Sequence, residues 1–334
     1  MTRRLQFALF RRCAALLALS LLLRGLPHWD RSHFSFRLPE KSAAEEKGQA
    51  APSEPPAAEQ PGRRLPLLRF RDVPADEPAD LPEAQIQPAP LPDFSAMDAG
   101  SIVIHGNCTL DYDRAALLAA PLPAAATAEG PQVLIVQTHS TEAYEPEPGW
   151  EYEETEPYRT LDPNYSVIRV GAEIAGVLES CGISVIHDQT INDYPSYSGS
   201  YDRMAETIQN YLAAYPTIRM VVDVHRDAIE TASGAMGGTA KNGTARVMLV
   251  SGTDEGGLYH PHWQQNLSCA LKLERLLESE SPGTSRGIAL VTQRYNQHLT
   301  PLSLLAEFGA AGDTLQEALS AARSFGKSLA RLLS

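Results

Sequence analysis

The sequence predicts one α/β domain, in which a mostly parallel central sheet lies between two layers of helices. From residue 131 to residue 334, short apolar runs typical of buried strands alternate with segments of helical periodicity. Such alternation over about 200 residues indicates strand–helix–strand units with parallel strands. This alternation is missing before residue 131. Residues 31–130 instead contain 14 of the 25 prolines. We therefore expect a single three-layer domain behind a long extended segment.

Within the domain, six apolar runs are the expected strands: 133–136, 183–186, 220–224, 247–250, 288–291 and 304–305. Between them, apolar residues recur every three or four positions over residues 166–180, 201–214 and 263–277, which predicts helices. We expect the last helix to begin at Asp313, because a carboxylate suits the N-cap position. A short strand is also expected within residues 101–105, docked onto the domain.

Residues 1–27 have the pattern of a membrane signal. Four arginines between residues 3 and 12 precede an apolar run, 13–23, which is closed by Arg24. This length matches the apolar part of a signal peptide, and it also serves as an uncleaved anchor if the arginines reach the membrane surface. Because basic residues dominate the N-terminal side, we expect the chain to be anchored in the cytoplasmic membrane with its folded domain outside the cytoplasm.

Residues 28–98 are rich in Pro, Ala and Glu and poor in aromatic residues, so we expect a disordered linker. Residues 99–130 are expected to form a short lead-in segment to the folded domain at 131–334. The chain carries 41 acidic and 28 basic residues, a formal net charge of −13. This balance excludes nucleic acid as an expected partner, because phosphate neutralisation needs clustered Lys and Arg.

Histidine and glutamate side chains follow three of the expected strands. His139 and Glu142 follow the first strand, His225 ends the third, and Glu307 ends the last. The carboxyl ends of parallel strands meet at one edge of a sheet, so these groups are expected close together. Two imidazoles and a carboxylate are a typical catalytic zinc set, and a second carboxylate acts as general base. We therefore expect His139, His225 and Glu142 to bind zinc and Glu307 to act as the base.

Other polar residues near these strand ends are candidates for supporting roles. Arg226 is a candidate for oxyanion stabilisation. Asp223 and Asp227 are candidates for orienting zinc ligands, although helix capping or an ion pair would equally explain both. Tyr194, Tyr197 and Arg203 are candidates for a substrate groove, although loop tyrosines also simply cover sheet edges. A serine or cysteine nucleophile is poorly supported, since the sequence contains no G-x-S-x-G motif.

The same segments carry a family resemblance. The sequence resembles the stage II sporulation protein P family across nearly the whole domain, and its motifs occur in the family's order. The segments are LIVQTHSTEAY (134–144), SVIRVGAEIAGVLESCGISVIHD (166–188), DYPSYSGSY (193–201), VVDVHRDA (221–228) and RYNQHLTPLSLLAEFGAAGDTLQEA (294–318).

The resemblance implies a peptidoglycan hydrolase with one Zn²⁺ per chain and the fold of the N-acetylmuramoyl-L-alanine amidases. Such enzymes cut the amide between N-acetylmuramic acid and L-alanine, and the family is also credited with cleaving peptide cross-links. The implied setting is engulfment of the forespore, with the domain in the intermembrane space of the sporangium and stage II sporulation proteins D and M as partners. By motif, His139 and His225 resemble the zinc ligands and Glu307 the catalytic glutamate.

Two departures from the family pattern leave alternatives open. The family usually has His-x-His at the first strand end, but here Gln137 stands at the first position. Amidases of the wider fold take their acidic ligand from the start of the first helix, which here has no acid before Glu173. We favour Glu142 as that ligand, and its rivals are Glu153, Glu154 and Glu156.

Two other functions therefore remain as alternatives. One is a catalytically silent scaffold of the cell envelope that keeps the fold, a reading to which Gln137 gives weight. The other is a zinc peptidase or deacetylase that acts on another envelope polymer.

Overall fold

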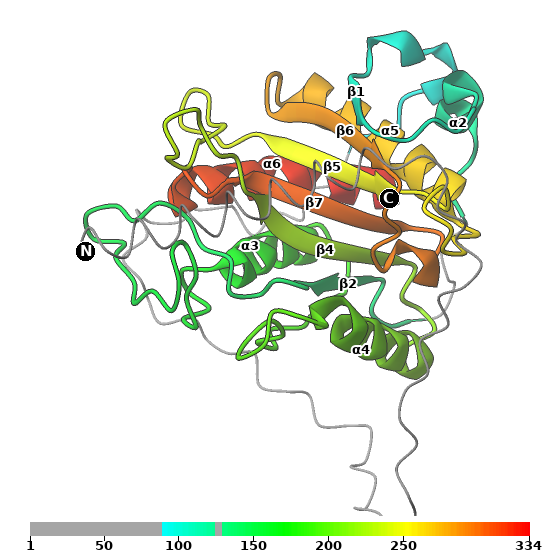
Figure 1. Cartoon of the computed structure of the whole chain (residues 1–334). Coiled ribbons are helices and arrows are strands. Elements are labelled where there is room, and N and C mark those ends of the chain that lie inside the picture. The colour runs from blue at the N-terminus through cyan, green and yellow to red at the C-terminus, as the bar shows by residue number, and fades with distance from the viewer. Residues whose placement is uncertain (1–88, 124–128) are drawn as a thin grey trace, which may run out of the picture. The chain divides into compact units, whose positions relative to one another are not determined.

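The structure is a computed structural model that describes residues 89–123 and 129–334. A sheet of seven strands forms its centre, and Figure 1 shows how the strands lie side by side. The strands lie in the order β1-β6-β5-β7-β4-β2-β3. Their bounds are β1 Ile104–Gly106, β2 Val133–Val136, β3 Val185–His187, β4 Met220–Asp227, β5 Val247–Gly252, β6 Ser285–Val291 and β7 Ser303–Ala310. The predicted mixed α/β architecture is confirmed.

The direction of the strands divides this sheet into two halves. Strands β3, β2, β4 and β7 run parallel to one another, and we call them the β4 half. Strands β1, β6 and β5 are also mutually parallel, and we call them the β5 half. The halves meet where β5 pairs antiparallel with β7. The sheet is therefore mostly parallel, as predicted, but it contains one reversal that the strand–helix alternation did not reveal.

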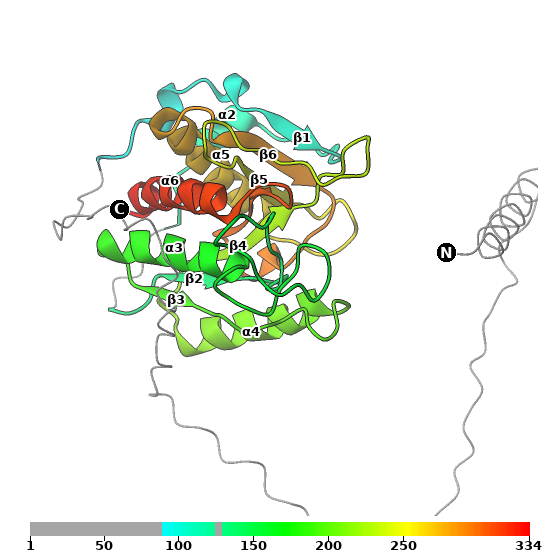
Figure 2. The same ribbon diagram turned by 90° about the vertical axis from the view of Figure 1, so that its left-hand side faces the viewer.

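Helices cover both faces of the sheet (Figure 2). On one face lie α3 (Val167–Ser180), α5 (Trp263–Glu280) and α6 (Leu315–Leu333), whose apolar residues share a core with the sheet. On the other face α4 (Ser200–Ala214) buries Met204 and Ile208 against β2 and β4. Alternate strand residues point to opposite faces, so β2 contributes Val133 and Ile135 to the first core and Leu134 and Val136 to the second.

The start of α6 differs from the expectation. Thr314, rather than Asp313, is the N-cap, and its hydroxyl and the Glu317 carboxylate form a reciprocal capping box. The Asp313 carboxylate instead accepts bonds from the backbone N–H groups of Thr239, Ala240 and Ala310. Both residues have side chains suited to an N-cap. Two backbone donors from the loop at residues 239–240 and one from Ala310, at the end of β7, hold Asp313 in a turn and leave the cap to Thr314.

The lead-in segment contributes to the domain. Strand β1 pairs with β6 at the edge of the sheet, three residues beyond the expected start, and α2 (Arg114–Ala119) follows it. The last residues of the predicted linker include the short 3₁₀ helix η2 (Phe94–Ala96), and Phe94 packs on the main core. The predicted membrane signal at 1–27 and most of the linker lie outside the described residues. Among the residues that the structure describes, no helix is long and apolar enough to cross a membrane.

Candidate active site

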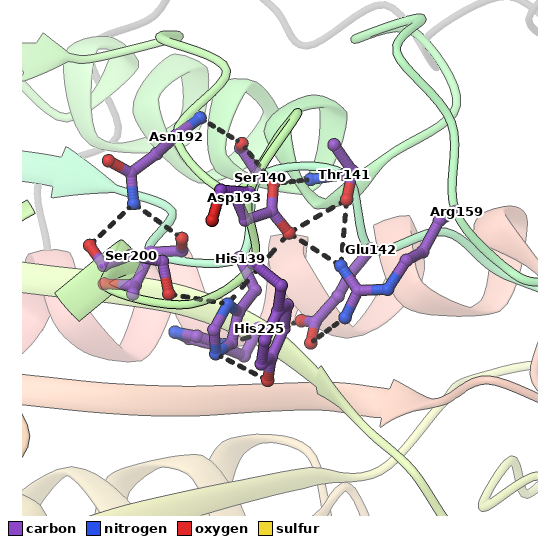
Figure 3. Close-up of polar contacts among 12 residues, drawn as sticks. His139, Ser140, Thr141, Glu142, Arg159, Asn192, Asp193, Ser200 and His225 are labelled. Carbon is purple, nitrogen blue, oxygen red and sulfur yellow. Dashed lines mark hydrogen bonds and ion pairs between the residues drawn. The ribbon is translucent and has the colours of Figure 1, made fainter. Parts of the chain in front are cut away.

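The carboxyl ends of β2, β4 and β7 meet at one edge of the sheet, as their shared direction requires. His225 on β4 pairs directly with Glu307 on β7, so the two side chains emerge on the same face. The turn that follows β2 carries His139 and Glu142, both almost fully buried. Figure 3 shows that His139, Glu142 and His225 gather in one cluster from these two elements. The structure thus brings together the four residues that the sequence proposed as zinc ligands and base.

Each nitrogen of the His225 ring faces a carboxylate. Nδ1 lies 3.4 Å from Glu142 Oε2, and Nε2 lies 3.0 Å from Asp223 Oδ1. Asp223 is held in turn by the backbone N–H and the hydroxyl of Thr138, at 2.8 and 2.6 Å. Asp223 therefore fixes the orientation of the ring and directs Nδ1 toward Glu142.

The two carboxylates change the protonation of this buried histidine. Burial alone would lower the pKa of His225, but Asp223 and Glu142 outweigh it and raise the pKa well above its usual range. Burial would likewise raise the pKa of Glu142, yet its hydrogen bond and attraction to His225 lower the pKa to about 2. Glu142 is consequently an anion at neutral pH, as a zinc ligand must be.

His139 contacts groups from the segment between β3 and α4. Its Nε2 lies 3.0 Å from the hydroxyl of Tyr197, whose ring stacks on the imidazole at 4.4 Å between centroids. Its Nδ1 lies 3.3 Å from the Ser200 hydroxyl and 4.0 Å from Asp193 Oδ2. The rings of His139 and His225 are nearly perpendicular, with centroids 5.2 Å apart. Burial lowers the pKa of His139, which favours the neutral form that binds metals.

Glu307 is a buried carboxyl group without a full set of partners. Its Oε2 has no hydrogen-bond partner among residues 89–123 and 129–334. Burial raises the pKa of Glu307 to about 8. A buried carboxyl group with one unpartnered oxygen and a raised pKa, paired with His225 across the two strands, is suited to exchange a proton.

The donor set suits zinc, although the described residues are not yet arranged around an ion. Two imidazoles and a carboxylate are the ligands of many catalytic zinc sites. Bonds of about 2.0–2.1 Å place neighbouring tetrahedral ligands about 3.4 Å apart, and His225 Nδ1 and Glu142 Oε2 are separated by 3.4 Å. Within 89–123 and 129–334, however, no group of three or more His, Cys, Asp or Glu side chains is already placed to hold a metal. The Tyr197 hydroxyl lies at His139 Nε2. If His139 bound zinc through Nε2, the metal would replace this hydroxyl as the partner of the nitrogen.

The candidates for supporting roles are used differently from one another. The Arg226 guanidinium donates to the carbonyls of Ala143 and Tyr158, and its backbone N–H donates to Glu142. Arg226 therefore supports the turn that carries Glu142. Asp227 pairs with Arg286 at 2.8 Å, the ion-pair alternative that the sequence left open.

The three groove candidates lie in the segment that begins after β3. Tyr194 and Arg203 line a surface hollow of about 540 Å³ beside α4, whereas Tyr197 lies against His139. The Arg203 guanidinium donates to the carbonyls of Asn192, Ser196 and Ser198, so it holds this loop in shape.

Gln137, the departure from the family pattern, points away from the cluster. Its side-chain amide lies 2.9 Å from His187 Nε2, beneath α3. The two side chains lie so close to Gly171 of α3 that a Cβ atom on this residue would collide with both of them. The substitution therefore lies on the face opposite α4 and leaves His139 in the cluster. The three rival acids to Glu142 are exposed, namely Glu153, Glu154 and Glu156.

Two residues of the site were missed by the sequence analysis, Arg159 and Asp193. Asp193 accepts hydrogen bonds from Ser140 and Thr141 in the turn after β2, and Arg159 Nη1 lies 2.6 Å from its Oδ2 (Figure 3). Both come from irregular loops, where strand and helix periodicity gives no signal. Only the DYP segment that contains Asp193 had been noted, as part of the resemblance.

Comparisons with known proteins agree with the resemblance. The model of the stage II sporulation protein P family matches residues 40–330. The stage II sporulation protein P of Bacillus subtilis strain 168 is 29% identical over 215 residues, which are 60% of this chain and 51% of the relative. The chain thus spans about half the length of the curated relative it matches.

Solved structures with some likeness include two amidases. They are Ami1 of Mycobacterium abscessus in its apo form (TM-score 0.39, 14% identity, 61% of this chain and 99% of that one) and CwlD of Clostridioides difficile in complex with the GerS lipoprotein (0.38, 13%, 60% and 98%). At scores this low the likeness does not establish a shared fold.

Proposed function

Because the chain belongs to the stage II sporulation protein P family, we propose that it is a zinc-dependent peptidoglycan hydrolase. The bond we propose is the amide between N-acetylmuramic acid and the L-alanine of the stem peptide. The family supplies the expectation of a cell-wall substrate. The cluster at the ends of β2, β4 and β7 supplies the reactive groups.

The observation that carries this proposal is the pairing of His225 with Glu307 across β4 and β7, with Glu142 3.4 Å from the same imidazole. A carboxylate base beside the proposed metal position is an arrangement suited to hydrolysis of an unactivated amide. Among the described residues, Ser200 is the only serine or cysteine that hydrogen-bonds to His139 or His225. Its hydroxyl lies at His139 Nδ1. Water is therefore the proposed nucleophile.

We propose His139, Glu142 and His225 as the residues that hold the zinc ion. When bound, zinc would supply a Lewis acid that polarises the amide carbonyl and makes bound water more acidic. Asp223 lies at Nε2 of His225, so Nδ1, which faces Glu142, is the proposed ligand atom. On zinc binding, Nδ1 would release its proton, because only a neutral imidazole binds a metal. Arg226 keeps Glu142 in place through its backbone N–H.

Glu307 would move the proton during the reaction. The pKa of Glu307 would fall beside a bound zinc cation, and its carboxylate would then accept a proton from the attacking water, whose oxygen forms the new bond to the lactyl carbonyl carbon. The carbon–nitrogen bond then breaks, and Glu307 returns the proton to the departing amine of L-alanine. The products are a free lactyl carboxylate on the glycan and a stem peptide with a free N-terminal L-alanine.

The test is digestion of purified peptidoglycan sacculi by the zinc-loaded protein, followed by mass spectrometry of the soluble products. We expect stem peptides with free N-terminal L-alanine and about one zinc per chain by elemental analysis. Cleavage within the cross-links alone, or loss of acetyl groups, would replace the amidase by a peptidase or a deacetylase. A protein that takes up no zinc and releases nothing would be a scaffold.

We further propose that residues 1–27 anchor the chain in the cytoplasmic membrane, with the domain outside the cytoplasm facing peptidoglycan. Stage II sporulation proteins D and M are the proposed partners. Fractionation of cells, with protease digestion of intact protoplasts, tests the location. A domain protected from protease would contradict it.

A further inference from the structure

Asp193 is a buried carboxylate that fixes the turn carrying two proposed zinc ligands. Its side chain is fully buried, and its Oδ1 accepts from the Ser140 hydroxyl at 3.0 Å and the Thr141 N–H at 3.1 Å. Its Oδ2 accepts from the Thr141 hydroxyl at 2.8 Å and lies 4.0 Å from His139 Nδ1. Asp193 therefore determines where the backbone between His139 and Glu142 lies.

Arg159 is the cation that neutralises this carboxylate. Its Nη1 donates to Asp193 Oδ2 at 2.6 Å and to the Thr141 hydroxyl at 2.9 Å, and its Nη2 lies 3.8 Å from Glu142 Oε1. Its guanidinium also lies over the Tyr197 ring, 5.0 Å from the centroid. One side chain thus contacts the carboxylate behind His139 and the proposed ligand Glu142 (Figure 3). It also contacts the tyrosine that is stacked on His139.

The backbone around Arg159 strengthens this connection. Residues 142 and 159 form an antiparallel bridge, and the N–H of Thr160 donates to the carbonyl of Thr141 at 2.9 Å. The loop that carries Arg159 is therefore paired with the turn after β2. A guanidinium can bridge two carboxylates because its donors lie in a rigid plane, whereas a lysine offers a single point charge.

We propose that Arg159 is a positioning residue for the zinc site. Arg159 holds Glu142 directly, and it holds His139 through Asp193. The inference rests on the proposed function for its metal. Its geometry does not depend on catalysis, because every contact exists without substrate. Arg159 touches no proposed reacting atom, so it acts only through the proposed ligands.

The test compares Arg159→Ala and Arg159→Lys with wild type in the full chain. Zinc affinity is measured by competition with a chromophoric chelator, and kcat and KM are measured on sacculus fragments. We expect Arg159→Ala to weaken zinc binding roughly 10- to 100-fold, the range for residues that orient metal ligands. We expect kcat to fall with little change in KM, and Arg159→Lys to restore part of both, because it returns the charge without the fork.

Arg331→Ala is the matched control. The Arg331 side chain is 20% exposed, near the 17% of Arg159, and it pairs with Glu280 at 2.7 Å, remote in sequence from the site segments. We expect it to lower thermal stability without changing zinc affinity or kcat. If Arg159→Ala and Arg331→Ala change zinc affinity equally little, the positioning role is wrong.

Hydrogen exchange of the zinc-free protein separates this inference from the proposed function. Loss of the Arg159 contacts should speed exchange of the Thr141 and Glu142 amides several-fold in Arg159→Ala and less in Arg159→Lys. This result can be obtained even if the wild-type protein hydrolyses no peptidoglycan. Unchanged exchange at these amides in both variants would overturn the inference. If Arg159→Ala does not fold, the lysine variant alone gives the answer.

Discussion

The two halves of the sheet carry different chemistry at the ends of their strands. In the β4 half, β4 and β7 end beside the turn after β2, and the histidines and glutamates gather there. In the β5 half the strands run the other way. Val250 near the end of β5 pairs with Leu305 near the start of β7, so β5 ends at the opposite edge.

Two polar residues at that opposite edge, Gln297 and Thr253, have structural partners. The Gln297 side chain accepts from the Gly252 N–H and donates to the Val250 carbonyl, and the Thr253 hydroxyl donates to the Val291 carbonyl. Strand direction, rather than membership of the sheet, therefore decides which side chains meet. A reactive cluster needs several strands that end on one side.

The largest expected effect is a loss of kcat when a residue at the reactive edge is replaced, with no loss when a residue at the opposite edge is replaced. Glu307→Gln should lower kcat roughly 100- to 10,000-fold, because the amide keeps the shape of the side chain but cannot accept a proton. Zinc content and the free energy of unfolding should stay close to wild type. Thr253→Val, at the other edge, is the control and should leave kcat unchanged while it removes one hydrogen bond. Equal kcat in Glu307→Gln and wild type would remove Glu307 from the mechanism.

Much of this cluster could be predicted from the sequence. His139, His225 and Glu307 each follow an apolar run, and parallel strands bring such residues to one edge. The prediction worked because the three strands concerned all belong to the β4 half. The reversal at β5 could not be predicted, because an apolar run of four residues gives no direction.

The residues that support the cluster could not be predicted for a different reason. Arg159 and Asp193 lie in loops far apart in the chain, and they meet only because Asp193 bonds to the turn after β2. Hydrogen bonds between loops leave no periodic pattern in a sequence. The orientation of Gln137 was likewise hidden, because it depends on which face of the sheet α3 covers.

A second prediction sharpens the comparison within the β4 half, where one face is reactive and the other is not. His187 ends β3 but lies under α3 against Gln137. Burial lowers the pKa of His187 to about 4, whereas the unfolded chain keeps its ordinary value near 6.5. Below pH 6.5 the unfolded state therefore binds a proton that the folded state does not, so stability falls as the pH drops toward 4.

Between pH 7.5 and pH 5 this difference amounts to about 2 kcal/mol. Chemical denaturation at the two pH values measures it, and His187→Gln should lose about that much of the pH dependence while kcat at neutral pH stays unchanged. The same dependence in the variant and wild type would mean that His187 titrates normally. A large fall in kcat would place His187 in the reactive cluster after all.

The smallest expected effect is the loss of the cap of α6, which lies next to Asp313, a carboxylate close to the end of β7 with a structural role. Thr314→Ala removes the hydroxyl that caps α6 and should cost about 1 kcal/mol of unfolding free energy. Asp313→Ala should cost more, because three backbone N–H groups lose their acceptor, and each unmet buried donor costs about 1–3 kcal/mol. Denaturant titration of both variants measures the difference. If Thr314→Ala were the more damaging change, the cap would have been assigned to the wrong residue, or Asp313 would not hold its turn.

The expected order implies that proximity to the end of a strand in the β4 half is not sufficient for a catalytic role. Glu307 qualifies because its Oε2 has no hydrogen-bond partner in the described part of the chain, whereas both oxygens of Asp313 accept from backbone N–H groups.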